Sequence, residues 1–417
     1  MRRPSQLLLR KLLLILICLG TVSIYLGRVI AVYGARSANS DSTTVADLEH
    51  DIRWLPDDAE LHHLLGLLLS DSGHSNADAI AHLRRATILN PNNGWYWLDL
   101  ASVYRGAGDV EKEHEAVQFA LHAEPGNPEI AAEAAKYFLA AGDVNRALPL
   151  FRQAVTQNPQ VAESILQACW DETQNANLLL ARVIPDSPEL QLVLLQILTG
   201  QRQTVAANDV WQYLVSSAKS FDPQLSFFYF DYLLKEHETI RFEGAWRELA
   251  GLSPNLQTYL PNDNLIVNGG FEQPVLNAGL DWRFEPSEHV TAGIDDQVAH
   301  SGTHSLSLTY DGNPAYDAGW KQYVPVQSDT DYQFSAWIKS ENVTSSSGPR
   351  IAIVDAYSGQ NLLLTDDVLD THPWQQITGS LRVPAGIELL AVKIVRAPAN
   401  MRISGRIWID DVHLVKR

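Results

Sequence analysis

Residues 97–125, WLDLASVYRGAGDVEKEHEAVQFALHAEP, contain one unit of a repeat that decides the fold of the N-terminal half. Gly108 and Gly142 recur at a period of about 34 residues, and each is followed by an aspartate. The same interval separates three prolines and three alanines, namely Pro91, Pro125, Pro159, Ala86, Ala120 and Ala154. A fixed period of this length predicts short helical units that stack on one another.

Within one unit, Trp97, Leu100, Ala101 and Tyr104 precede the Gly-Asp pair, and this order resembles the tetratricopeptide repeat (TPR) family. The resemblance implies two antiparallel helices in each unit and a concave face that binds a peptide or a partner protein. The clear units cover about residues 57–159, and weaker helical patterns continue to residue 260. We expect these diverged helices to extend the same solenoid.

A multidomain α + β protein with four parts is predicted from these patterns. Residues 1–34 form a basic tip and a transmembrane signal anchor, and residues 35–44 form a small, polar linker. Residues 45–260 form the TPR-like α-helical solenoid. Residues 261–417 form an antiparallel β-sandwich of the jelly-roll type.

The predicted membrane anchor covers residues 12–27, LLLILICLGTVSIYLG, which carry no charge. Four basic residues precede this run and two follow it, which favours a cytoplasmic N-terminus. The bulk of the chain is therefore expected on the periplasmic side of the inner membrane. A cleaved signal peptide is the alternative, since small residues follow at Gly34-Ala35 and Ser37-Ala38.

The charge of the chain argues against nucleic-acid binding, and the positions of its cysteines argue against an internal disulfide. The formal net charge is −18, and residues 1–40 contain only basic charges, so the remaining chain is more acidic still. An acidic surface repels phosphate backbones, and we expect no nucleic-acid partner. Of the two cysteines, Cys18 lies in the apolar run and Cys169 in the helical part, so no internal disulfide is expected.

After residue 260 the pattern changes to short alternating segments separated by Gly, Asn, Asp and Ser. The run from Tyr332 to Ile338 (YQFSAWI) alternates large apolar residues with others, which is typical of a half-buried strand. About eight to ten such strands in this length predict two packed sheets.

Six segments of this module are similar to the galactose-binding-like jelly roll of carbohydrate-binding modules. They are Asn264–Glu272 (NLIVNGGFE), Trp282, His300–Leu306 (HSGTHSL), Tyr332–Lys339, Trp374 and Gly405–Val412 (GRIWIDDV). The resemblance implies the fold and a glycan as ligand. It also implies a structural calcium ion in many relatives, with Glu272 and Asp411 at the carboxylate positions and carbonyl groups near Ser301 completing the shell.

Sugar recognition requires aromatic rings that face solvent, because a pyranose ring has flat C–H faces and a rim of hydroxyl groups. We expect the loops of the module to provide these rings, with polar side chains nearby as hydrogen-bonding partners. The candidates are Tyr310, Tyr316, Trp320, Tyr357, Asp311, Asn313, Asp317 and Gln360. Regular alternation places Trp337 on the face opposite Phe334.

No motif of a hydrolase, a metalloprotease, a P-loop or a dinucleotide-binding site occurs in the sequence. We therefore expect a non-enzymatic, membrane-anchored adaptor of the bacterial envelope. Its helical repeats would bind a protein partner, and its jelly roll would contact a glycan during exopolysaccharide or cell-wall polymer synthesis or export. The alternative is an assembly scaffold whose sandwich binds protein or only packs, with no sugar ligand.

Overall fold

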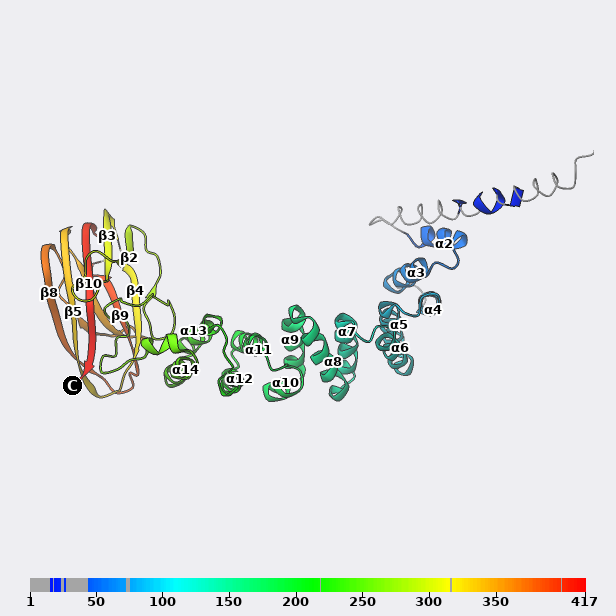
Figure 1. The fold of residues 1–417 in the computed structure, drawn as a ribbon, viewed down its shortest axis with the longest axis horizontal. Coiled ribbons are helices and arrows are strands. Elements are labelled where there is room, and N and C mark those ends of the chain that lie inside the picture. The colour runs from blue at the N-terminus through cyan, green and yellow to red at the C-terminus, as the bar shows by residue number, and fades with distance from the viewer. Residues whose placement is uncertain are drawn as a thin grey trace, which may run out of the picture. The chain divides into compact units, whose positions relative to one another are not determined.

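The computed structural model describes residues 16–17, 19–23, 26–27, 44–72, 76–217, 219–315, 317–398 and 400–417. The chain forms two compact units, Met1–Pro185 and Asp186–Arg417. Helices precede strands along the chain, so a helical N-terminal region is followed by an antiparallel β-sandwich (Figure 1). Residue 261, where the sequence predicts the change of domain, lies inside the second unit.

The helices of the first unit pack in consecutive pairs, α3 with α4, α5 with α6 and α7 with α8. They are α2 (Val45–Trp54), α3 (Ala59–Asp71), α4 (Asn76–Leu89), α5 (Gly94–Gly106), α6 (Val110–Ala123), α7 (Pro128–Ala140), α8 (Val144–Gln157), η1 (Pro159–Val161), α9 (Ala162–Thr173) and α10 (Ala176–Arg182). The interval from the start of α5 to the start of α7 equals the interval from α6 to α8 and from Gly108 to Gly142. The period of the sequence is therefore the period of the helix pairs.

The repeated Gly-Asp pair forms the turn inside a helix pair. Gly108 has a φ of +77°, a left-handed conformation that glycine adopts without steric cost and that ends α5. Asp109 then caps α6, because its carboxylate accepts a hydrogen bond from the backbone N–H of Lys112 at 3.2 Å. Gly142 and Asp143 repeat this arrangement between α7 and α8.

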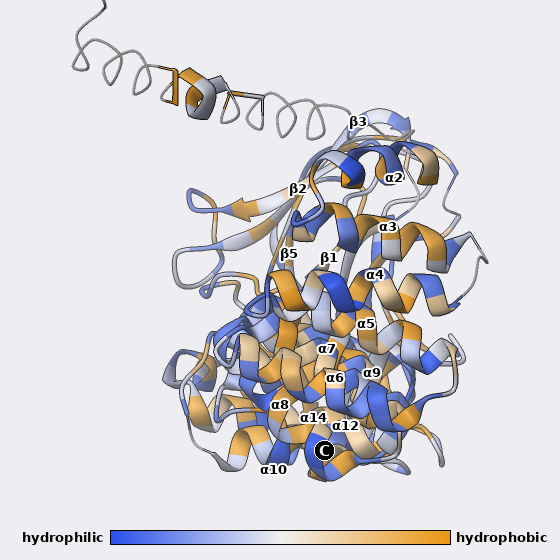
Figure 2. Cartoon of the chain, turned by 90° about the vertical axis from the view of Figure 1, so that its right-hand side faces the viewer, coloured by the Kyte–Doolittle hydropathy of each residue, from blue (hydrophilic) through white to orange (hydrophobic). Residues whose placement is uncertain are grey.

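Small residues allow the paired helices to approach closely. A Cβ atom at Gly66 of α3 would lie 2.6 Å from Cγ of Leu83 on α4, so a larger residue there would force Leu83 to move. Ala86, Ala120 and Ala154 are fully buried at equivalent places. Figure 2 shows both hydrophobic and hydrophilic stretches on α3, α4 and α5, as expected for helices that bury one face.

Of the predicted anchor over residues 12–27, the structure describes 16–17, 19–23 and 26–27, and the other positions lie outside the described residues. Within the ranges that the structure describes, no helix is both long enough and apolar enough to cross a membrane. Cys169 in α9 is fully buried, and burial raises the pKa of its thiol to about 12.

The second unit begins with four further α-helices and continues into ten described strands. The helices are α11 (Pro188–Gly200), α12 (Thr204–Ser216), η2 (Pro223–Ser226), α13 (Phe227–Lys235), α14 (Thr239–Leu252) and η3 (Pro254–Tyr259). The strands are β1 (Arg283–Phe284), β2 (Val290–Asp295), β3 (Ser305–Pro314), β4 (Asp317–Pro325), β5 (Thr330–Thr344), β6 (Pro349–Asp355), β7 (Asn361–Leu364), β8 (Asp370–Val383), β9 (Leu389–Arg396) and β10 (Arg402–Lys416).

The strands form two five-stranded antiparallel sheets, with orders β1-β4-β9-β6-β7 and β2-β3-β10-β5-β8. Figure 1 shows β8, β5, β10 and β3 side by side in one layer. Alternation decides which side chains fill the core: Tyr332, Phe334 and Ala336 of β5 are buried between the sheets. Trp337 lies on the opposite face, as predicted, where it stacks on His300 with ring centroids 3.9 Å apart.

The last helical hairpin packs directly against the sandwich. Trp246 of α14 is fully buried, and its indole N–H donates to the carbonyl oxygen of Tyr259 at 2.9 Å. Gly279, in the segment before β1, has a φ of +56°, and a Cβ atom there would lie 2.1 Å from the Trp246 ring. The hydroxyl of Tyr259 donates to the Pro274 carbonyl at 2.7 Å. Helix α14 and this segment therefore share one packed interface.

Candidate functional site

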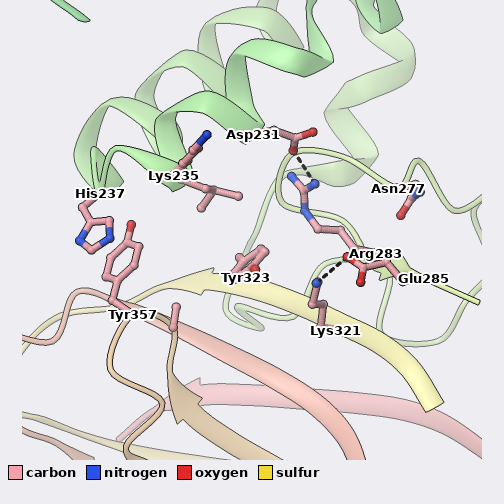
Figure 3. A pocket seen from close by; sticks show the side chains of 11 residues that line it. Asp231, Lys235, His237, Asn277, Arg283, Glu285, Lys321, Tyr323 and Tyr357 are labelled. Carbon is pink, nitrogen blue, oxygen red and sulfur yellow. Dashed lines mark hydrogen bonds and ion pairs between the residues drawn. The ribbon is translucent and has the colours of Figure 1, made fainter. Parts of the chain in front are cut away.

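A pocket of about 570 Å³ lies between α13 and the outer face of the sheet that contains β1 and β4 (Figure 3). Its lining combines charged, amide and aromatic side chains with two apolar ones. The lining residues are Asp231, Leu234, Lys235, His237, Asn277, Arg283, Glu285, Lys321, Tyr323, Ala356 and Tyr357.

The sheet side of the pocket comes from strand alternation. In β4, Trp320, Gln322 and Val324 are buried, so Lys321 and Tyr323 point outward into the pocket. Arg283 of β1 pairs with Lys321 across the strands, and its guanidinium carbon lies 5.6 Å from the centre of the Tyr323 ring. Two neighbouring strands thus present a tyrosine and two cations together.

The opposite side comes from helix α13 and the turn that follows it, which face Tyr357 in the turn between β6 and β7 of the sheet (Figure 3). Asp231 and Lys235 lie on α13, and His237 follows in a left-handed conformation with a φ of +61°. His237 stacks on Tyr357, with ring centroids 3.8 Å apart. The hydroxyl groups of Tyr357 and Thr239 lie 3.1 Å apart, so the turn between β6 and β7 is hydrogen-bonded to the first residue of α14.

The charges in the pocket are only partly paired. Nη1 of Arg283 donates to Oδ1 of Asp231 at 2.5 Å, and Nζ of Lys321 donates to Oε1 of Glu285 at 2.8 Å. The hydrogen bond from Lys321 lowers the pKa of Glu285, so this carboxylate is charged at neutral pH. Nε and Nη2 of Arg283 are buried and have no hydrogen-bond partner among the described residues.

A second pocket of about 270 Å³ continues along the same sheet face. It shares Glu285 and Lys321 with the first pocket and adds Asp317 and Lys393. The ion pair of Lys321 with Glu285 lies in the wall of both pockets.

Two of the predicted glycan-binding rings lie in the core of the sandwich. Tyr310 of β3 and Trp320 of β4 are each only 4% exposed. Both were expected on loops, but β3 extends to Pro314 and β4 begins at Asp317, so both residues fall on inward positions of strands. Their rings pack in the core and are not available to stack on a sugar.

The remaining candidates are divided between two places. Asp311, Asn313 and Asp317 are exposed near the connection of β3 and β4, where Asp311 accepts hydrogen bonds from His289 and from the backbone of Asn313. Tyr357 and Gln360 lie in the turn between β6 and β7, and Tyr357 lines the pocket with 37% of its surface exposed. Tyr316 lies outside the described residues.

Arg283 and Tyr323 are pocket residues that the sequence analysis did not single out. The alternation of Ala318, Trp320 and Gln322 with Lys321 and Tyr323 was a usable signal, since it places Tyr323 on the outer face. Nothing local to Arg283 indicates that α13, which lies far earlier in the chain, supplies its partner Asp231.

The two carboxylates predicted to bind calcium both meet the segment His300–His304. Oε1 of Glu272 accepts hydrogen bonds from the backbone N–H groups of Thr303 and His304, at 2.7 and 2.9 Å. Oδ1 of Asp411 accepts from the hydroxyl of Ser301 at 2.8 Å, and Oδ2 lies 2.6 Å from Nδ1 of His300. The segments that the sequence analysis grouped are thus brought together.

The arrangement of these groups does not fit a calcium ion, because N–H and O–H donors face the carboxylate oxygens that an ion would need. In the described ranges, no group of three or more His, Cys, Asp or Glu side chains could hold a metal. Burial raises the pKa of Glu272, but hydrogen bonds from His304 and Thr303 outweigh burial and lower it to about 2. The carboxylates therefore fasten a tight turn.

Residues 263–398 match the family model of a carbohydrate binding domain. This match covers the strands from β1 to β9, including the sheet side of the pocket. The helices, among them α13 on the other side of the pocket, precede the matched residues. No curated protein matches the chain.

Solved structures of carbohydrate-binding modules are similar to part of the chain. A structure titled "CBM4 structure and function" is 18% identical, with a TM-score of 0.29, and the match covers 36% of this chain and 99% of that one. The CBM22-1 xylan-binding domain of Paenibacillus barcinonensis Xyn10C is 14% identical, with a TM-score of 0.24 and coverages of 36% and 91%. TmCBM61 in complex with β-1,4-galactotriose is 16% identical, with a TM-score of 0.27 and coverages of 37% and 99%.

Proposed function

We propose that this protein is a non-enzymatic adaptor of the bacterial envelope that contacts a glycan through its carbohydrate-binding domain. The observation that carries the proposal is the pocket in which two tyrosines, Tyr323 and Tyr357, accompany Arg283 and Asn277 on the face of the matched domain. Aromatic rings suit the C–H faces of a sugar, and the amide and guanidinium groups suit its hydroxyl groups.

The proposal extends to the rest of the chain. The repeated helix pairs would act as TPR units that bind a protein partner, and a groove lined by Trp97, Tyr104 and Phe119 offers aromatic surface for it. An anchor over residues 12–27 would hold the protein in the inner membrane with its bulk in the periplasm. In that place it would serve the synthesis or export of an exopolysaccharide or cell-wall polymer.

The charges of the pocket support a binding role over catalysis. Glycoside hydrolysis requires a carboxylic acid with a raised pKa opposite a second carboxylate. The pocket contains Asp231 and Glu285, but each pairs with a cation, and the pKa of Glu285 is lowered by Lys321. A carboxylate paired with a cation is a poor proton donor, which supports the proposed binding role.

The test is binding of the full chain to a panel of bacterial and plant polysaccharides, measured by pull-down and calorimetry. Tyr323→Ala removes a ring from the pocket wall, and we expect it to weaken binding by at least about tenfold, or about 1.4 kcal/mol. Tyr213→Ala is the matched control, because Tyr213 is an exposed tyrosine of α12 that does not line the pocket.

Equal binding by the Tyr323→Ala variant and the wild type would place the glycan elsewhere on the domain. A folded protein that binds no polysaccharide of the panel would instead favour the alternative function, an assembly scaffold. The packing of α14 against the segment before β1 supports the form of that alternative in which the sandwich only packs, because this contact lies within the chain.

A further inference from the structure

The pocket described above is bounded by α13 along one whole side. The helix and the turn after it contact the sandwich at two points, one on either side of the pocket (Figure 3). At one point, Asp231 of α13 forms an ion pair with Arg283 of β1 at 2.5 Å. At the other, His237 stacks on Tyr357 with ring centroids 3.8 Å apart. All four residues line the pocket, so these two contacts are part of its wall.

The two contact points lie on different strands of the same sheet. β1 is the edge strand of the order β1-β4-β9-β6-β7, and Tyr357 lies in the turn that follows β6. Strands β4 and β9 come between them, and Tyr323 of β4 lines the pocket from the sheet side. The end of α13 therefore lies across the strands, and Figure 3 shows it above the strand that carries Tyr323.

This arrangement limits how a long ligand can lie on the sheet. A polysaccharide that is bound by its internal sugars needs two exits from the site. Along the strands, α13 closes the exit at the end of β4 that carries Tyr323, and across the strands the two contact points close both sides. One direction remains, along β4 over the ion pair of Lys321 with Glu285, whose side chain is 75% exposed. A pocket with a single exit suits the end of a chain.

We infer that this pocket binds the terminal sugar of a glycan chain, with α13 as the wall against which that sugar lies. The inference rests on the proposed glycan-binding function and names the part of the glycan that the site recognises. Lys235 of α13 is exposed in this wall, and its ammonium group can donate hydrogen bonds to the hydroxyl groups of the sugar. Because α13 precedes the matched residues 263–398, the selection of chain ends comes from outside the matched domain.

The first experiment counts the proteins bound by each glycan chain. The full chain is titrated calorimetrically with trimers, hexamers and polymers of narrow size range, made of β-1,4-linked xylose, galactose or mannose or of α-1,4-linked glucose. We expect one protein per glycan chain at every length, and an affinity per chain that changes by no more than about twofold from hexamer to polymer. A site for internal sugars would hold more proteins on the polymer than on the hexamer.

The second experiment changes one end of a hexamer at a time. Borohydride reduction opens the ring of the sugar at the reducing end, and O-methylation at C4 blocks the opposite end. Since only one end enters the pocket, we expect one of these modifications to weaken binding by about tenfold or more and the other to have little effect.

A variant of α13 tests whether the chain end lies against this helix. Lys235→Ala removes a hydrogen-bond donor from the wall, and we expect it to weaken binding of hexamer and polymer several-fold and by the same factor. Lys136→Ala is the matched control, because Lys136 is an exposed lysine of α7 that does not line the pocket. Both substitutions change exposed side chains and leave the fold intact.

The outcomes separate this inference from the proposed function. Several proteins on each polymer chain, or equal binding of the unmodified hexamer and both modified hexamers, would overturn the inference and leave glycan binding in place. Wild-type affinity in the Lys235→Ala variant would also overturn it, because the chain end would then not lie against α13. Failure of every oligosaccharide and polysaccharide to bind the folded chain would overturn both.

Discussion

At the scale of single residues, Asp281 makes the stability of the second unit depend on pH. Its carboxyl group is fully buried, Oδ2 accepts one hydrogen bond from the N–H of Leu276 at 2.7 Å, and Oδ1 has no partner among the described residues. Burial raises the pKa of Asp281 to about 7. In the unfolded chain the pKa of an aspartate is about 3.9, so between these values the native state binds the extra proton.

We therefore expect the free energy of unfolding to decrease as pH rises from about 4 to about 7, and Asp281→Asn to remove that decrease. At pH 8 the asparagine variant should be more stable by up to about 4 kcal/mol, since it has no buried charge. Urea denaturation at several pH values measures this. The same pH slope in the variant and the wild type would show that Asp281 is not the source.

Glu272 has the opposite dependence on pH. Burial raises its pKa, but hydrogen bonds from His304 and Thr303 lower it to about 2, so it stabilises the native state above its unfolded pKa of about 4.3. This contribution should disappear as pH falls from about 4 to about 2. Glu272→Gln should lower the free energy of unfolding at pH 7 by only roughly 1 kcal/mol, because solvent screens the charge of a partly exposed side chain. In acid, the free energy of unfolding of this variant should depend less on pH than that of the wild type.

Acid titrations followed by circular dichroism check this prediction, with Glu388→Gln as an exposed control in the same sandwich. A steeper loss of structure in acid for Glu272→Gln than for the wild type would contradict it. Repeating the measurement with calcium tests the ion that the resemblance implies: a rise in Tm that requires both Glu272 and Asp411 would show that the turn rearranges to bind it.

At the scale of elements, the contact between α14 and the segment before β1 depends on Gly279. A Cβ atom there would lie 2.1 Å from the Trp246 ring, at a φ of +56° that disfavours larger residues. We expect Gly279→Ala to destabilise the second unit by roughly 2–5 kcal/mol, from overpacking and backbone strain. Gly244→Ala in α14 should be neutral or stabilising by about 0.5–1 kcal/mol, since no atom lies within 4 Å of its Cβ position. Thermal melts of both variants measure the difference.

Local signals predicted the elements better than their contacts. The recurring Gly108-Asp109 pair gave the period of the helix pairs, and in the structure it ends one helix and caps the next. Likewise, alternation in β5 correctly predicted the outward Trp337. The alternation in β4 that places Tyr323 outward also places Trp320 inward, so a local signal for Trp320 existed and was not applied to it. The joining of Arg283 to α13 depends on tertiary packing, and no pattern in the sequence reports it.

At the scale of the whole molecule, the division at Pro185 and Asp186 determines which fragments should be stable. The second unit includes α11–α14 with the strands. A fragment of residues 186–417 should keep the Trp246 interface, whereas residues 261–417 would expose the segment that Trp246 covers. We expect the shorter fragment to melt at least about 6 °C lower and to bind more of a hydrophobic dye. Equal melting temperatures would show that the strands fold without the helices.

The interface around Trp246 also bears on how such a chain can change in evolution. A domain that is transferred to another protein stays folded only if the segments that cover its core are transferred with it. Here such a segment has to include α14, because the absence of a side chain at Gly279 leaves the space that Trp246 fills. It also has to include α13, which carries the pocket residues Asp231 and Lys235. We therefore expect descendants of this domain to inherit the hairpin and the strands together.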